Sequence, residues 1–392
     1  MKICIPLKIS AETVTTLLVS CLFFLYLQVN FWRCFGLWNI LQVDIFRLVL
    51  AVACFGAAFN EGRKIRIPIK CVNYLIITVG VGILMQFLNG RNAIGVTSSA
   101  IIAVLFAFVF ATKRIYIFFL YVHILILTVV IGYKFYSGQD PNTMFEGTSR
   151  NIISVFFMIA AIVINIEELK HKKSVTLWPA VLFLVFSIAA VGRGGVVCAL
   201  FYFISVCGYK LYCLDKIRRR RILVFLLCFG ILLFVEYASV IVDYISNLEV
   251  FMRLNGQETS GNGRAVMNAA YLRNINFLTF FYGYEFSSDP IFISEGHLNP
   301  HNSFITLHRL YGFVGIIFLG ILINAMLRLW NARKKIYVFF LCVVLLRGAS
   351  EQIMFPGEYD FIILTILLFS KYWTINHVEM FSCSVKNREC NC

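Results

Sequence analysis

Long apolar runs recur along the whole chain, and each is about as long as a helix that crosses a bilayer. Because unbroken apolar runs of this length are typical of membrane-spanning helices, the pattern predicts an all-α polytopic membrane protein with about 12 transmembrane helices. We expect residues 1–392 to form a single integral membrane domain. The predicted spans are 13–32, 37–59, 71–89, 93–111, 115–135, 151–166, 175–191, 194–213, 222–243, 304–327, 336–353 and 361–375.

Composition supports this assignment. Hydrophobic residues make up 60% of the chain, charged residues only 14%, and the mean hydropathy is +0.82. These values lie outside the range of soluble globular proteins. Since the apolar runs continue to the far end of the chain, we expect no cleaved signal peptide and a short cytosolic segment, 1–9, before the first span.

The net charge of +15 is concentrated in alternate connections between the predicted spans. Roughly 24 of the 35 Lys and Arg residues fall on one side, 8 on the other and 3 within spans. Cytosolic connections are enriched in basic residues, so we expect both termini to be cytosolic. The run Arg218–Arg221 is then an anchor beside anionic lipid, and we expect no nucleic-acid partner. The basic connections are "EGRKIRIPIK", "TKR", "EELKHKK", "DKIRRRR" and "RLWNARKK".

One connection is much longer than the others. Residues 244–303, between the ninth and tenth predicted spans, form a large external loop on the charge argument. Asn262 is a suitable helix cap and helix-forming residues follow it, so we predict an external helix from about Gly263 to Asn274. Acids, arginines and aromatic residues are mixed in this loop, and a sugar-binding site needs such a mixture.

The stretch "GHLNPHNSFITLHRLYGFVG" leads from this loop into the tenth span. Asn299 suits an N-cap and Pro300 the first helical position, so we expect His301 and Asn302 in the first turn. The free N–H groups of a helix start attract anionic oxygens such as phosphate, and they favour a neutral His301 that can accept a proton. The alternative is that His301 is an ordinary interfacial residue.

Two further positions carry polar groups next to apolar helices. His308 lies two helical turns beyond His301 and is adjacent to Arg309; it can act in the site or be a buried histidine bonded to a neighbouring helix. Arg193 lies in the glycine-rich turn "AAVGRGGVVCAL", where its planar guanidinium could bind a phosphate through two hydrogen bonds. The alternative is an arginine whose side chain extends to lipid headgroups.

Other polar groups in the spans have simpler interpretations. Asp44 and Arg47 are spaced to pair with each other, as are Arg347 and Glu351, and we expect both pairs to be structural. The histidines lack metal-ligand spacing to acids or thiols, so no metal and no cofactor are expected.

Taken together, the "RG" turn, the long loop with "GR" and "FYGYE", and the "HNSFITLHRLYGFVG" segment resemble the O-antigen polymerase and O-antigen ligase superfamily of lipid-linked glycan transferases. The resemblance is best from about Ala189 to Leu327. Members typically have a serine before the arginine of the "RG" turn, where this chain has Gly192. The functional positions of the family fall on Arg193, Arg264 and His301.

This resemblance implies a metal-independent glycosyltransferase that acts on the periplasmic face of the bacterial inner membrane. In an O-antigen polymerase, the growing glycan passes from undecaprenyl diphosphate to a hydroxyl of a new lipid-linked repeat unit. Arg193 and Arg264 would then stabilise the leaving diphosphate, and His301 would accept the proton of the attacking hydroxyl. Further substrate contacts are expected from Asn302, Tyr284, Glu285, Glu295, His308 and Arg309, with Glu285 and Glu295 as reserve bases.

The expected partners are an undecaprenyl-diphosphate-linked oligosaccharide and membrane lipid, and a chain-length regulator protein is left open. One alternative function is an O-antigen ligase, which uses the same chemistry with a lipid A core acceptor. A lipid-linked glycan flippase or transporter, which about 12 spans would also fit, is an alternative of another class. A structural membrane scaffold would leave the long external loop unexplained. The sequence does not specify the sugars, the linkage, the stereochemical outcome, the chain length or the oligomeric state.

Overall fold

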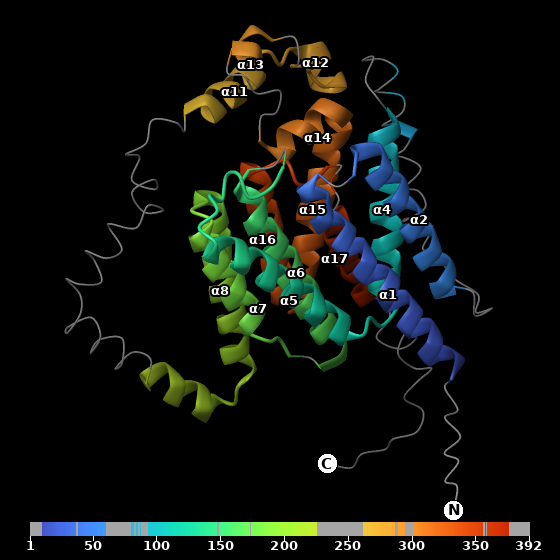
Figure 1. The fold of residues 1–392 in the computed structure, drawn as a ribbon. Coiled ribbons are helices and arrows are strands. Elements are labelled where there is room, and N and C mark those ends of the chain that lie inside the picture. Colours follow the sequence, from blue (N-terminus) through green and yellow to red (C-terminus); the bar gives the residue numbers. More distant parts are fainter. Residues whose placement is uncertain are drawn as a thin grey trace, which may run out of the picture.

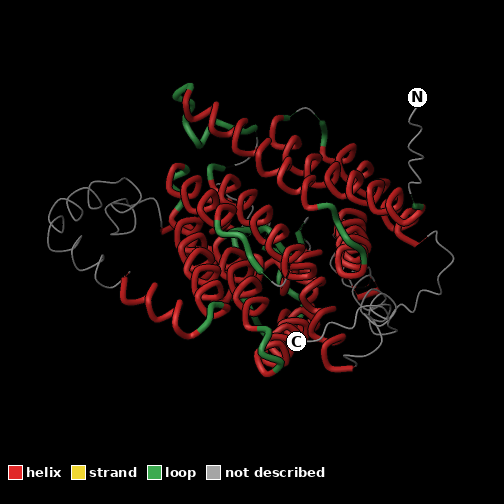
Figure 2. The backbone as a smooth tube through the Cα atoms, turned by 90° about the horizontal axis from the view of Figure 1, so that it is seen from below, coloured by secondary structure: helices red, strands yellow, loops and turns green. Residues whose placement is uncertain are grey.

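The computed structural model describes residues 10–36, 38–59, 80, 81, 84, 87, 93–146, 149–172, 174–225, 262–286, 289–294, 301–355, 357 and 359–375. Every regular element within these ranges is helical (Figure 2), which confirms the prediction of an all-α protein. The predicted spans 71–89 and 222–243 fall largely outside the described residues. Most of the loop 244–303 before Asn262, and Glu295 within it, also lie outside them.

The first half of the described chain consists of long apolar helices that pack side by side (Figure 1). Their starts lie within four residues of those predicted for the corresponding spans, because the apolar runs themselves define the helices. The helices are α1 (Ala11–Trp32, extended by the short η1, Arg33–Phe35), α2 (Ile40–Phe59), α4 (Ala93–Thr112), α5 (Ile117–Tyr136), α6 (Asn151–Lys172), α7 (Trp178–Ala189) and α8 (Arg193–Cys213).

The second half contributes both short helices and spans. They are α11 (Asn262–Arg273), α12 (Phe277–Tyr282), α13 (Pro290–Ser294), α14 (Ser303–Tyr311), α15 (Phe313–Asn331), α16 (Lys335–Ser350) and α17 (Asp360–Ile375). Among the described residues, six helices are long and apolar enough to cross a membrane: α1, α2, α5, α6, α8 and α15. This finding supports a membrane protein, while the predicted total of about 12 spans stays a prediction.

Helix α6 is the centre of the bundle, buried without interruption from Ile153 to Glu168. It packs against α5, α7 and α8, and α8 in turn packs against α16. Helices α1, α4 and α17 also pack together. Phe23 of α1 contacts Phe106 of α4 and Phe361 of α17 at ring-centroid distances of 5.7 and 5.6 Å. The helix α17 therefore packs among helices from the first third of the chain.

The predicted tenth span, 304–327, is interrupted in the structure. It divides at Gly312 into α14 and α15, because Gly312 has φ +53°, a conformation that ends a regular helix and suits glycine. A Cβ at this position would lie only 1.9 Å from the carbonyl oxygen of Phe281 in α12. The break therefore lets α12 approach the backbone of Gly312 closely.

The helices α11, α12 and α13 lie beyond one end of the bundle (Figure 1). The observed α11 confirms the predicted helix to within one residue at each end, while its external location stays a prediction. Its Met267 and Tyr271 pack with Phe286 and Phe292, and this small apolar cluster rests on Ile305 of α14. This apolar cluster holds α11 and α13 over the start of α14.

Candidate functional site

Polar side chains from five segments meet at the end of the bundle covered by α11, α12 and α13. Their centre is Glu351, the first residue after α16, which is buried. Its carboxylate accepts a hydrogen bond from the Asn151 side chain at the start of α6. It also lies 3.3 Å from Nη1 of Arg264 and 3.2 Å from Nδ1 of His301.

Ser303 attaches the start of α14 to the chain that follows α16. Its hydroxyl donates to the backbone carbonyl of Glu351 at 2.7 Å and accepts from the backbone N–H groups of Ile353 and Met354. Because Ser303 is fully buried, these bonds hold two segments about 50 residues apart in sequence in one arrangement. His301 is thereby placed beside Glu351.

The N-cap of this helix differs from the prediction. Asn302, not Asn299, caps α14, and its side-chain oxygen accepts from the N–H groups of Phe304 and Ile305 at 2.9 and 3.3 Å. His301 therefore precedes the cap and is not in the first turn. The local sequence favoured Asn299 because Pro300 suits a first helical position, but the contacts of Ser303 determine where the helix starts.

His301 adopts φ +48°, which is uncommon for a residue other than glycine. A carboxylate only accepts hydrogen bonds, so Nδ1–H of His301 donates to Glu351. In the neutral imidazole this assignment puts the basic lone pair on Nε2. The arrangement suits a histidine that takes up a proton next to a stabilising carboxylate.

The side chain of Arg264 extends from α11 to the end of α16. Its Nη1 donates to the carbonyl oxygen of Ser350 at 3.0 Å as well as contacting Glu351. Its side chain is 42% exposed. The guanidinium is thus oriented by the end of α16 and still accessible to a ligand.

The turn that carries Arg193 lies against the same end of α16. Arg193 is the first residue of α8 and half-buried. A Cβ on the following residue, Gly194, would lie 2.7 Å from Oγ of Ser350 and 3.0 Å from Nη1 of Arg347. Glycine at position 194 therefore permits the close approach of the turn to α16, and the turn that carries Arg193 lies next to this cluster.

The two predicted structural ion pairs have different outcomes. Asp44 and Arg47 do pair, at 3.2 Å. Arg347, in contrast, donates to Oγ of Ser350 and to the carbonyl oxygen of Asn151, both at 2.9 Å, and no direct ion pair joins it to Glu351 among the described residues. The bend of the chain after Ser350 turns Glu351 toward Arg264 and His301.

The charges around Glu351 favour its ionised form. Glu351 follows α16 and lies outside the membrane-spanning helices, where burial acts to raise the pKa of its carboxyl group. The hydrogen bond from His301 and the positive charges of Arg347 and Arg264 outweigh burial, so that the pKa lies below its ordinary value. Glu351 is therefore an anion at neutral pH.

The remaining predicted site residues make structural contacts nearby. His308 uses both ring nitrogens: Nε2–H donates to the carbonyl of Phe280 at 3.0 Å, and Nδ1 accepts from the hydroxyl of Tyr271 at 2.8 Å. This confirms the interpretation of His308 as a histidine bonded to neighbouring helices. Arg309 pairs with Glu285 at 3.2 Å, and its guanidinium lies 4.5 Å from the ring centroid of Phe286.

Tyr284 completes this second group of contacts. Its hydroxyl donates to the buried Asp289 at 2.8 Å, and Asn274 donates to the same carboxylate oxygen. Burial, and next the bond to Asp289, raise the pKa of Tyr284 to about 12. The phenol is thus a hydrogen-bond donor at neutral pH and not a base.

Sequence reasoning missed Glu351 and Asn151 as members of the site. The spacing of Arg347 and Glu351 suggested a self-contained pair, and nothing local linked Asn151, about 200 residues earlier, to either. An acid near one end of a predicted span was the available signal. The described part of the chain contains no group of three His, Cys, Asp or Glu side chains that could hold a metal ion.

Comparison of the chain with protein-family models, with curated proteins and with solved structures found no match. The function is therefore argued from the chemistry of these residues and from the resemblance of their motifs.

Proposed function

We propose that this protein is a membrane glycosyltransferase that polymerises a surface polysaccharide of the O-antigen type from undecaprenyl-diphosphate-linked repeat units. The observation that carries the proposal is the gathering of His301, Arg264 and the Arg193 turn around Glu351. His301, Arg264 and Arg193 were each predicted as site residues from the sequence, and they come from distant parts of the chain. A cationic cluster with one oriented histidine suits transfer from a lipid diphosphate.

In the proposed reaction, a sugar hydroxyl of the acceptor repeat unit attacks the anomeric carbon of the donor glycan. Nε2 of His301 accepts the hydroxyl proton as the new glycosidic bond forms. The bond between the anomeric carbon and the diphosphate oxygen breaks, and Arg193 and Arg264 stabilise the negative charge of the leaving undecaprenyl diphosphate. Glu351 orients the imidazole and stabilises it once it is protonated.

The distribution of charge supports an external location for this site. Asn151 begins α6 at the cluster, and Lys170 and Lys172 end it. A helix of 22 residues spans about 30 Å, the thickness of the hydrocarbon core of a bilayer. Lys113 and Arg114, before α5, contribute to the same basic end. Because basic residues favour the cytosolic side, the cluster belongs on the periplasmic side of the bacterial inner membrane.

The test is polymer formation by purified protein supplied with lipid-linked repeat units. His301→Ala should lose about 100-fold to 10,000-fold in rate, the usual contribution of a general base. Arg193→Lys keeps the charge but loses the planar pair of donors, so it should retain more activity than Arg193→Ala. Full turnover by a correctly folded His301→Ala protein would remove this residue from the mechanism.

An O-antigen ligase would use the same cluster with a lipid A core acceptor. Deleting the gene distinguishes the candidates by the surface polysaccharide that remains. Loss of a polymerase leaves caps of a single repeat unit, loss of a ligase leaves bare core, and loss of a flippase leaves lipid-linked units inside the cell.

A further inference from the structure

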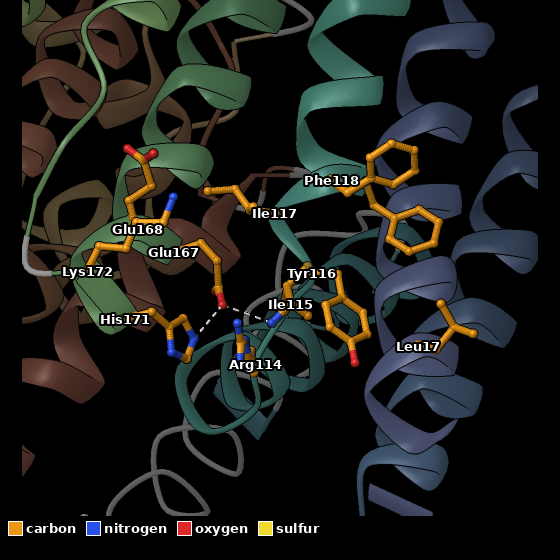
Figure 3. A pocket seen from close by; sticks show the side chains of 11 residues that line it. Leu17, Arg114, Ile115, Tyr116, Ile117, Phe118, Glu167, Glu168, His171 and Lys172 are labelled. Atoms are coloured by element: carbon orange, nitrogen blue, oxygen red, sulfur yellow. Dashed lines mark hydrogen bonds and ion pairs between the residues drawn. The ribbon is translucent and has the colours of Figure 1, made fainter. Parts of the chain in front are cut away.

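A cavity of about 370 Å³ lies at the end of α6 opposite to Glu351 (Figure 3). Its walls come from α1, the connection between α4 and α5, the start of α5 and the last two turns of α6. Since α6 is about as long as a bilayer core is thick, this cavity lies at the second membrane surface. It is separate from the cluster proposed for glycan transfer.

The acidic residues at the cavity are already bonded within the protein. Glu167 accepts from Nζ of Lys170 at 2.6 Å, from His171 at 2.9 Å and from the backbone N–H of Ile115 at 2.9 Å. Glu168 accepts from the hydroxyl groups of Tyr121 and Thr176, and its carboxylate is directed away from Arg114 (Figure 3). These acids are therefore not the partners of the exposed cations of the cavity.

Two of those cations, Arg114 and Lys172, are exposed. In the part of the chain that the structure describes, neither forms an ion pair with a carboxylate. The guanidinium of Arg114 lies 6.0 Å from the ring centroid of Tyr116, near the middle of the group of side chains in Figure 3. The two side chains provide positive charge at a membrane surface, one from the connection between α4 and α5 and one from the last residue of α6.

The other side of the cavity is apolar and faces outward. Leu17 of α1 and Phe118 of α5 are 48% and 66% exposed, and Figure 3 shows them on the opposite side from His171 and Lys172. Both belong to helices long and apolar enough to cross a membrane. An apolar wall that opens toward lipid, next to exposed cations, matches the chemistry of a phospholipid.

We propose that this cavity binds an anionic phospholipid, with its phosphate between Arg114 and Lys172 and an acyl chain along Leu17 and Phe118. Basic pockets between membrane helices on the cytosolic side are suited to acidic lipid headgroups. The bound lipid would join the ends of α1, α5 and α6. The inference does not depend on the function proposed for the Glu351 cluster.

The experiment uses the purified, delipidated full chain and native mass spectrometry to measure lipid occupancy. The probes are phosphatidylglycerol, phosphatidylcholine and undecaprenyl phosphate, each titrated over a range of concentrations. The test variant is Arg114→Gln with Lys172→Gln. The control is Lys216→Gln with Arg220→Gln, which removes two exposed basic residues at the same basic end but outside the cavity.

We expect phosphatidylglycerol to bind the wild-type protein and the control alike, and the test variant about thirtyfold more weakly, since each basic residue near a membrane surface contributes about fivefold. Equal binding of phosphatidylglycerol and phosphatidylcholine would overturn the proposal, and so would equal losses in both double variants. Stronger binding of undecaprenyl phosphate that depends on Arg114 and Lys172, without displacement by phosphatidylglycerol, would assign the cavity to the carrier lipid instead.

Discussion

Glu351→Gln isolates the electrostatic role of the residue at the centre of the cluster. The substitution keeps the volume of the side chain and a hydrogen-bonding oxygen for Asn151, but it removes the negative charge next to His301 and Arg264. The side chain of Glu351 is only 11% exposed, so water cannot replace the lost interactions effectively.

The magnitude follows from the contacts. The charged hydrogen bond with His301 contributes about 1.5 to 3 kcal/mol. The contact with Arg264 adds less than about 1 kcal/mol because that guanidinium is partly exposed and screened. We therefore expect Glu351→Gln to lower the free energy of unfolding by about 1.5 to 4 kcal/mol. Glu351→Ala should fall at the upper end or beyond, since it also removes the oxygen that accepts from the side-chain amide of Asn151.

The measurement is unfolding of the purified protein in mixed micelles, followed by the signal of its helices. Asp215→Asn is the control, because Asp215 pairs with Arg218 on an exposed surface where both side chains are more than half exposed. Removing that pair should leave stability unchanged within error. Polymer formation is measured on the same preparations, and Glu351→Gln should lose activity at a temperature where it is fully folded.

Two results would refute this reasoning. A Glu351→Gln protein as stable as Asp215→Asn would show that the carboxylate does not hold the cluster together. A Glu351→Gln protein that is destabilised as expected but polymerises at the normal rate would confine Glu351 to a structural role.

Three further predictions concern the start of α14 and the imidazole. Asn302→Ala should cost about 1 kcal/mol of stability and Asn302→Ser much less, because either Asn or Ser can cap the helix; equal losses in thermal unfolding would argue against the cap. Gly312→Ala should destabilise by more than about 1 kcal/mol and expose α12 to protease, since its Cβ would collide with Phe281; an unchanged digestion pattern would contradict this. His301→Gln should lose nearly as much polymerisation activity as His301→Ala, because glutamine cannot accept a proton; substantial turnover by His301→Gln would limit the histidine to hydrogen bonding.

Apolar run length alone predicted most of the described helices. The segments that became α1, α2, α4, α5, α6 and α8 were located from sequence because a span must satisfy its backbone internally and present apolar side chains. The helix α11 was predicted from a local cap and the helix-forming residues after it. The choice of Arg193, Arg264 and His301 rested on glycine-rich turns and a motif resemblance, and these signals are also local.

The partners of those residues were decided only by the tertiary structure. Spacing suggested that Arg347 pairs with Glu351, but the bend after α16 and the bonds of Ser303 direct Glu351 to His301 and Arg264. The break at Gly312 was equally hidden, because a glycine within an apolar run is common in membrane helices, and its conformation here reflects the approach of α12. The lengths of the apolar runs specify which residues enter helices, whereas contacts between segments many tens of residues apart depend on how the finished helices pack.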